Sequence, residues 1–399
     1  MGMIRFTTAG ESHGKALVAI VEGVPAGLPL RAEDVDADLA RRMTGYGRGA
    51  RMKIEADRAQ LLAGVRLGAT LGSPIAVLIE NRDWANWEDV MDPGARDEEP
   101  RRRLTRPRPG HADLAGTLKY DRDDARDILE RASARETAAR VAVGAVCRRL
   151  LAEFGVEIGS HVVVLGGVTA APPAELPTPL NDASDSSPVR CLDPEAERAM
   201  IARIDAAKAD GDTLGGIAEV VVRGLPVGLG SHVSWDVKLD GRLAQALMST
   251  PAVKSVAIGL GAGAAMVPGS EAHDGIVRDD SAALTGGFRR PTNRAGGLEG
   301  GITTGAPLVL RVAMKPIATL MRPLPSVDLD TGKEASAQSE RSDVTAVPAM
   351  GVIAEAMTAL ILADAWRAKF GGDSLTEMRR NVDGYLAQLA RRRERWSRA

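Results

Sequence analysis

Short apolar runs and segments of helical periodicity alternate along this chain, and together they predict a mixed α/β protein. Apolar runs bounded by Gly and Pro turn residues predict strands at 16–21, 75–79, 216–222 and 308–313. Apolar residues at helical spacing predict helices at 33–43, 124–154, 240–248 and 347–368. The two longest of these helices are rich in small or apolar residues, which favours a layered arrangement with helices packed between sheets.

Two turn signatures recur in the same order in the two halves of the chain. GVPAGL at 23–28 and GLPVGL at 224–229 each follow a predicted strand, and TLGSP at 70–74 and TTGAP at 303–307 each introduce one. The repetition predicts an internal duplication of strand-turn-helix-strand units. Chance matching of glycine-proline turns is the alternative.

The chain is predicted to form a single domain over residues 1–399, with the pseudo-repeat covering roughly 1–150 and 200–370. Three polar, proline-containing segments predict long loops at 92–110, 170–188 and 322–342. The second of these is expected to be a loop excursion, over about 170–190, with little structure of its own.

Composition is that of a soluble globular enzyme, with 399 residues, a formal net charge of −2 and 44% hydrophobic residues. Aromatic residues make up only 3%, which disfavours the base-stacking surface of a single-strand nucleic-acid binder. Cys147 and Cys191 form neither a disulfide framework nor a metal-ligand spacing. The apolar stretch 344–363 contains Pro348 and Glu355, so a buried helix is expected there in place of a membrane span. Because residues 1–6 also lack a signal segment, the expected location is the cytoplasm.

Candidate chemistry gathers in glycine-containing loops. The stretch AGESHG at 9–14 presents an acid, a hydroxyl and the imidazole of His13 between glycines, and His111 follows the arginine-rich run 101–108. Nine of the 51 basic residues are lysine and the other 42 are arginine, whose planar fork suits carboxylates and phosphates. A nearly neutral chain with basic loops indicates a local cationic pocket for a small polyanion. Histidines in such a pocket are suited to proton transfer near neutral pH.

Two alternatives follow from the same residues. GLGAGA at 259–264 fits a loose dinucleotide fingerprint, although Pro268 and Gly269 leave no room for the helix which that fingerprint requires. The basic loops and the arginine-rich tail at 391–398 are compatible with RNA binding, which the low aromatic content and the near-neutral charge disfavour.

Seven motifs resemble those of the chorismate synthase family, and they occur in the family's order. The signature regions are GESHG at 10–14, ERASARET at 130–137 and RSD at 341–343. Further matching loops lie at 45–51, 106–113, 293–301 and 315–319. The likeness extends from about residue 4 to residue 385, nearly the whole chain.

This resemblance implies a phosphate lyase of the shikimate pathway, which leads to the aromatic amino acids. The implied reaction is the 1,4-elimination of phosphate from 5-enolpyruvylshikimate 3-phosphate to give chorismate, with reduced FMN required and no net redox change. The resemblance also implies a homotetramer with a β-α-β sandwich fold, central helices between antiparallel sheets and an external source of reduced flavin, with no metal, nucleic acid or membrane partner. An intrinsic NADPH-dependent reduction stays open, and a flavin oxidoreductase that consumes NADPH is the alternative enzyme.

The resemblance also assigns site residues by matching position. The implied catalytic residues are His13 beside the departing phosphate, His111 beside the flavin, and Asp343, which assists loss of the C6 proton. The implied substrate ligands are Ser12, Arg42, Arg48, Arg108, Arg135 and Arg341. The implied flavin ligands are Arg131, Ala132, Ser133, Ala252, Gly301, Lys315, Pro316, Ile317, Ala318, Thr319 and Arg341.

Overall fold

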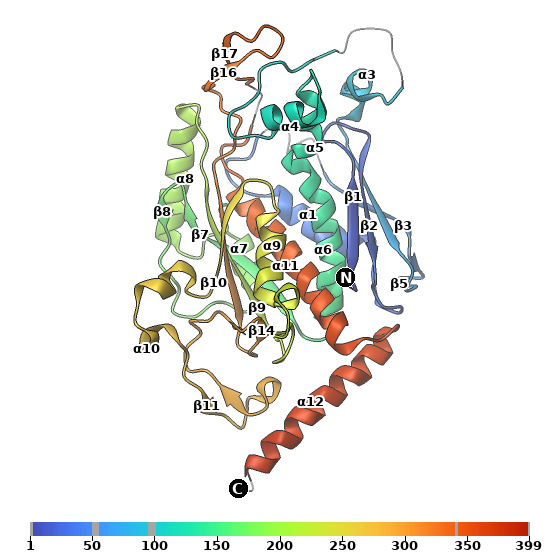
Figure 1. Ribbon diagram of the computed structural model, residues 1–399, viewed down its shortest axis with the longest axis vertical. Coiled ribbons are helices and arrows are strands. Elements are labelled where there is room, and N and C mark those ends of the chain that lie inside the picture. The colour runs from blue at the N-terminus through green and yellow to red at the C-terminus, as the bar shows by residue number, and fades with distance from the viewer. Residues whose placement is uncertain (1–2, 50–55, 95–100, 340–341, 398–399) are drawn as a thin grey trace.

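Two antiparallel sheets enclose a layer of helices (Figure 1). The computed structural model describes residues 3–49, 56–94, 101–339 and 342–397. One sheet has the order β1-β2-β6-β3, made of Arg5–Ala9, Ala16–Glu22, Ile75–Glu80 and Ala59–Ala63. The other has the order β10-β15-β9-β7-β8, made of Val253–Ile258, Leu308–Met314, Gly216–Arg223, Glu157–Leu165 and Val168–Thr169. The predicted combination of helices with antiparallel sheets is therefore confirmed.

Four helices fill the space between the sheets: α1 (Ala32–Met43), α6 (Thr137–Ala152), α9 (Leu239–Met248) and α11 (Val347–Phe370). The helix α6 packs against β2 and β6, whereas α11 packs against β7 and β9. The two helices meet where Gly144 faces Ala356, and a Cβ on Gly144 would lie 2.3 Å from the Cβ of Ala356. Small residues thus allow the close helix packing expected from the sequence.

The remaining helices and hairpins surround this sandwich. The other helices are α3 (Glu88–Met91), α4 (Asp113–Tyr120), α5 (Arg126–Ala132), α7 (Leu180–Asp185), α8 (Pro194–Ala209), α10 (Gly269–Ala272) and α12 (Leu375–Ser397), with 3₁₀ turns η1 (Trp84–Asn86), η2 (Ala134–Glu136), η3 (Trp235–Val237), η4 (Gly261–Met266) and η5 (Ala283–Thr285). The hairpins pair β4 (Val65–Arg66) with β5 (Ala69–Thr70), β11 (Val277–Arg278) with β12 (Phe288–Arg289), β13 (Leu298–Glu299) with β14 (Ile302–Thr303), and β16 (Pro325–Val327) with β17 (Glu334–Ser336).

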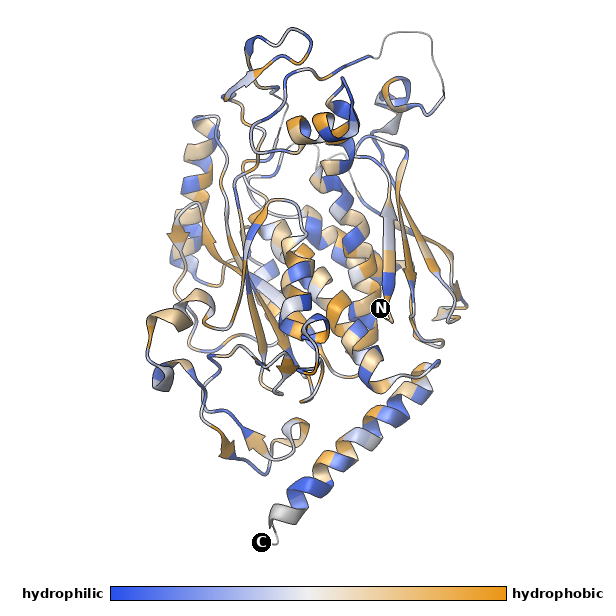
Figure 2. Ribbon diagram, viewed as in Figure 1, coloured by the Kyte–Doolittle hydropathy of each residue, from blue (hydrophilic) through white to orange (hydrophobic). Residues whose placement is uncertain are grey.

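Hydrophobic residues are concentrated on the central helices and on the strands that face them (Figure 2). The helix α12 carries mixed residues, and Leu375, Met378 and Val382 in its first half join the same core. By length and composition α11 could cross a membrane, yet 94% of its most apolar window is buried inside the protein. It is the core helix expected from the sequence, and Cys147 is buried beside it on α6.

The predicted helix at 124–154 is wrong in one respect, because it is two helices joined by a turn. Ser133 leaves the helical region at φ −63° and ψ 144°, and its hydroxyl accepts a hydrogen bond from the backbone N–H of Arg135. A serine side chain that satisfies a nearby backbone N–H competes with helix continuation, which explains the break between α5 and α6.

The predicted loop excursion at 170–190 is also wrong in part. It contains α7, and Leu180, Ser184 and Arg190 within it are buried. The polar segment 322–342 contains the β16–β17 hairpin. Both segments were predicted as loops from their polar composition, which does not distinguish polar residues that are buried in contacts from polar residues in a solvent-exposed loop.

The two halves share a strand order and a threonine contact. The order β1-β2-β6-β3 has its counterpart in β7-β9-β15-β10. The hydroxyl of Thr70 donates to the carbonyl of Pro25 at 2.6 Å, and that of Thr303 donates to the carbonyl of Pro226 at 2.7 Å. In each half, the threonine of the second turn signature therefore makes the same hydrogen bond to the proline of the first.

Candidate active site

The loop between β1 and β2 carries His13 and is pinned to α5. Gly10 has φ +107°, and a Cβ there would lie 2.4 Å from the carbonyl oxygen of Ala16, so the turn requires glycine. The backbone N–H of Ser12 donates to the carbonyl of Glu130 at 2.9 Å. The loop is thereby fixed against the helix that bears the second signature motif.

The imidazole of His13 is held on its edge and on one face. Its Nδ1 lies 2.9 and 3.0 Å from the two carboxylate oxygens of Glu130, and Trp87 stacks on the ring with centroids 3.8 Å apart. Arg126 donates to the same carboxylate at 2.9 Å. Burial acts to raise the pKa of Glu130, but hydrogen bonding and charge from His13, with Arg126, hold that pKa below its usual value. An ionised Glu130 therefore orients His13 through Nδ1.

His111 is held in the same manner at the start of α4. Its Nδ1 lies 2.5 Å from Asp113, and Arg108 donates from Nε to the other oxygen of that carboxylate at 2.8 Å. Arg108 also donates to the hydroxyl of Thr319 at 2.8 Å. Burial acts to raise the pKa of Asp113, and His111 and Arg108 outweigh it, so the pKa lies well below its usual value.

Arginines of α1 and η2 converge on one buried carboxylate. Arg135 donates from Nη1 to both oxygens of Asp57 at 2.7 Å, and Nη1 of Arg42 lies 3.8 Å from the same group. Burial, together with the charges of Arg48 and Arg135, lowers the pKa of Arg42 to about 10, against the opposing effect of Asp57. Among the described residues, Nη1 of Arg42 has no hydrogen-bond partner. The cluster has a donor to spare for an anion.

Asp343 lies beside Arg48, which belongs to the loop that follows α1. Its carboxylate accepts a hydrogen bond from the backbone N–H of Gly49 at 2.5 Å and lies 3.2 Å from Nε of Arg48. The side chain of Asp343 is 22% exposed. Arg341, predicted to bind both substrate and flavin, lies outside the described residues.

Asn81 and Ser133 join the His13 loop to the arginine cluster. Asn81 donates to the carbonyl of Gly14 at 2.6 Å and accepts from Nε of Arg135 at 2.9 Å. The hydroxyl of Ser133 donates to that of Ser12 at 3.1 Å. Ser12 and Arg135 therefore belong to one contact network with His13.

The His111 group approaches this network through the packing of α4 on α5, where Gly116 faces Ile128. A cavity of about 1330 Å³ is bordered by both histidine loops, since Glu11 and Ala112 line it together with Arg131 and Ala132. Neither histidine is among the described residues that line it.

The predicted flavin ligands are only partly gathered. Arg131 donates to the carbonyls of Thr8 and Gly10 at 2.9 and 3.0 Å. The segment 315–319 lies beside the His111 loop, because Nζ of Lys315 contacts the carbonyl of Gly110 and Thr319 binds Arg108. Ala252, at φ +68°, accepts from the backbone N–H of Lys315 at 3.0 Å.

Gly301 is separate from these groups. It lies in the β13–β14 turn against Lys238, and in Figure 1 this hairpin is well below α4 and α5. Its grouping with the other predicted flavin ligands stays a prediction.

Several contacting residues were not assigned a role from the sequence: Asn81, Trp87, Asp57, Asp113 and Glu130. The position of Asp113, two residues after His111, and that of Glu130, directly before Arg131, are the only local signals. The others are distant in sequence from the groups they touch.

Comparisons with known proteins place the chain in one family. The sequence model of the family described as chorismate synthase matches residues 4–366. The chain is 58% identical over 395 residues to the chorismate synthase of Symbiobacterium thermophilum, covering 98% of this chain and 100% of that protein. It is 58% identical over 397 residues to that of Streptomyces coelicolor, covering 98% and 99%.

A solved structure supports the same assignment. The crystal structure of a chorismate synthase is 42% identical, superimposes with a TM-score of 0.77, and covers 97% of this chain and 98% of that one. On the family match, the full-length relatives and the shared fold, this chain belongs to the chorismate synthase family.

Proposed function

We propose that this protein converts 5-enolpyruvylshikimate 3-phosphate to chorismate by 1,4-elimination. The C3–O bond to phosphate and a C–H bond at C6 break, a second ring double bond forms, and phosphate and a proton leave. Membership of the family supports this function. The observation that carries it in the structure is the cluster of Arg42, Arg48 and Arg135, because Nη1 of the buried Arg42 has no hydrogen-bond acceptor among the described residues.

His13 is proposed as the acid that protonates the departing phosphate. Its Nδ1 interacts with Glu130, so Nε2 is the nitrogen that would transfer the proton. Asp343 is proposed to assist removal of the C6 proton, with Arg48 and the backbone N–H of Gly49 orienting its carboxylate. The carboxylates and phosphate of the substrate would be bound by Ser12, Arg42, Arg48, Arg108, Arg135 and Arg341.

Reduced FMN is the proposed cofactor, and the residues present fit it. Its phosphate and ring require cationic, hydroxyl and backbone donors, which Arg131, Ser133, Lys315 and Thr319 provide. The other proposed ligands are Ala132, Ala252, Gly301, Pro316, Ile317, Ala318 and Arg341. When bound, the reduced flavin supplies an electron-rich ring that assists loss of phosphate without net oxidation. His111, held by Asp113, would stabilise negative charge on that ring, and exclusion of water would strengthen these interactions.

The proposed working form is a homotetramer in the cytoplasm that takes reduced flavin from an external source. We also propose that its two halves arose by duplication. Support comes from the shared strand order and from the matching contacts of Thr70 with Pro25 and of Thr303 with Pro226.

An anaerobic assay with dithionite-reduced FMN tests the function. Pure 5-enolpyruvylshikimate 3-phosphate should yield phosphate and chorismate in equal amounts, and no turnover at any protein concentration would refute the proposal. Following absorbance at 340 nm with NADPH over many turnovers separates the two enzyme classes, since an oxidoreductase consumes one NADPH per product and this lyase does not.

A further inference from the structure

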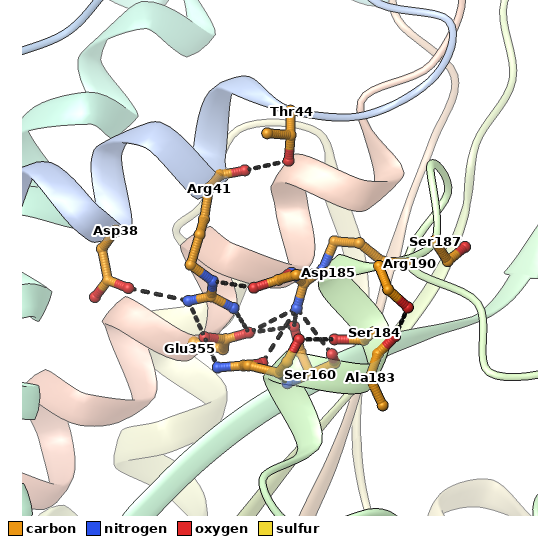
Figure 3. A network of polar contacts seen from close by, with 12 residues as sticks. Asp38, Arg41, Thr44, Ser160, Ala183, Ser184, Asp185, Ser187, Arg190 and Glu355 are labelled. Atoms are coloured by element: carbon orange, nitrogen blue, oxygen red, sulfur yellow. Dashed lines mark hydrogen bonds and ion pairs between the residues drawn. The ribbon is translucent and has the colours of Figure 1, made fainter.

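A carboxylate with no part in the proposed chemistry is buried at the centre of the apolar helix α11. Glu355 has no exposed surface. Arg41 donates to its two oxygens at 2.9 and 3.0 Å, and Arg190 donates to it at 3.0 Å (Figure 3). Arg148 donates to the same carboxylate at 2.6 Å. The hydroxyl of Ser160 on β7 adds a bond at 2.5 Å.

Two further carboxylates neutralise this cluster. Asp38 lies 3.0 Å from Arg41 and 2.9 Å from Arg148, while Asp185 accepts from Arg41 at 2.6 Å and contacts Arg190. Three arginines therefore face three carboxylates, and Glu355 is the one carboxylate among these that binds all three arginines. Burial acts to raise the pKa of Glu355, and the three guanidinium groups hold it well below its usual value. Within this cluster Glu355 is charged at neutral pH.

The cluster holds the start and the middle of one segment, residues 42–49, which we call the arginine strap because it carries Arg42 and Arg48. At its start, Arg41 precedes Arg42 on the last turn of α1. In its middle, the backbone N–H of Tyr46 donates at 2.7 Å to the carbonyl of Pro188, two residues before Arg190.

The strap in turn locates Asp343. The carbonyl of Gly47 accepts from the backbone N–H of Val344 at 2.8 Å, next to Asp343. The strap is closely packed at Gly47, since a Cβ there would lie 2.9 Å from the side chain of Ile204. A shift of the strap would therefore displace Arg42, Arg48 and Asp343 together.

We propose that Glu355 is a positioning residue, which through Arg41 and Arg190 fixes the arginine strap in the geometry that binds the substrate anions. The inference rests on the proposed function for the substrate, but the placement of the strap can be measured without it. It also explains the unpredicted structure at 180–190, because Asp185 of α7 accepts from Arg41 and the carbonyl of Pro188 accepts from Tyr46.

The chain offers a matched control on the same helix. Asp364 is a buried carboxylate of α11 that accepts from the backbone N–H of Ile4 at 2.6 Å and pairs with Arg242 on α9. None of these contacts involves the strap. Glu355→Gln and Asp364→Asn each remove one buried charge and leave an arginine uncompensated, which destabilises a fold at either position.

The experiment compares the two variants by hydrogen exchange and by steady-state kinetics. Glu355→Gln should speed amide exchange in the peptide covering 44–49 and lower kcat/KM for 5-enolpyruvylshikimate 3-phosphate by about 10- to 100-fold, the usual cost of misplaced binding groups. Asp364→Asn should leave both unchanged. Equal effects of the two variants, or no change in strap exchange with Glu355→Gln, would overturn the proposal.

Should either amide variant fail to fold, Arg190→Lys tests the contact between Arg190 and Glu355, and Arg242→Lys is its control at Asp364. Both substitutions keep the positive charge. Arg190→Lys should speed strap exchange and Arg242→Lys should not; equal exchange would overturn the proposal. The exchange result is independent of activity. An inactive wild-type enzyme with a strap that responds to Glu355→Gln would refute the proposed function and retain the positioning role.

Discussion

Replacing Gly144 by alanine tests the close contact on which the helical layer depends. The new Cβ would lie 2.3 Å from the Cβ of Ala356 and 2.5 Å from its Cα, so α6 and α11 would have to separate. Overpacking a core costs about 1–3 kcal/mol, whereas alanine is favoured over glycine in a helix by about 1 kcal/mol. Because one clashing atom belongs to the main chain, we expect the upper end of that cost and a net loss of about 2 kcal/mol.

Gly384 on α12 provides the same substitution in open space. It is exposed, and a Cβ there would meet nothing within 4 Å. Gly384→Ala should therefore stabilise the protein by about 0.5–1 kcal/mol through helix propensity. Thermal denaturation followed by circular dichroism should show a lower melting temperature for Gly144→Ala and a higher one for Gly384→Ala. A Gly144→Ala variant that melts at or above the wild-type temperature would refute the packing argument.

Three further predictions concern the site and the core. His13→Ala or His111→Ala should lower turnover by about 10²–10⁴-fold in the anaerobic phosphate-release assay, and an unchanged rate would remove the proposed role. Because the pKa of Asp113 is lowered by folding, its carboxylate stabilises the protein above the unfolded pKa and loses that contribution as the pH falls through the folded value. At pH 7 the melting temperature of Asp113→Asn should accordingly be lower than that of the wild type. As the pH falls, the melting temperature of the variant should decrease less than that of the wild type. Equal melting temperatures at pH 7 would contradict the assignment. Burial raises the pKa of the Cys147 thiol to about 12, so a thiol reagent should label it only on unfolding, and rapid labelling of the native protein would contradict its burial.

Local patterns predicted the main elements well, because strands and helices bury one face and leave a periodic trace in the sequence. The strand predicted at 308–313 is Leu308–Met314, and the helix predicted at 347–368 is Val347–Phe370. The break at Ser133 was not predicted, since the small residues around it suit a helix and the competing bond is made by a single hydroxyl.

The site was predicted in part. The motifs singled out His13, His111 and the arginines, but the partners that orient them are distant along the chain: Trp87 is stacked on His13, and Asp57 is shared by Arg42 and Arg135. No periodicity links such pairs. The grouping of Gly301 with the other flavin ligands stays a prediction.

The sequence by itself determined the main strands and helices of the two sheets and the layer between them, the buried character of α11 and the residue types available for binding anions, because these depend on neighbours within a few positions. Only the tertiary structure decided that Glu355 would pair with three arginines from α1, α6 and the segment after α7, and that a supposed loop would support the arginine strap. A buried charge is stable only where opposite charges converge from several elements, and that convergence exists only once the chain has folded.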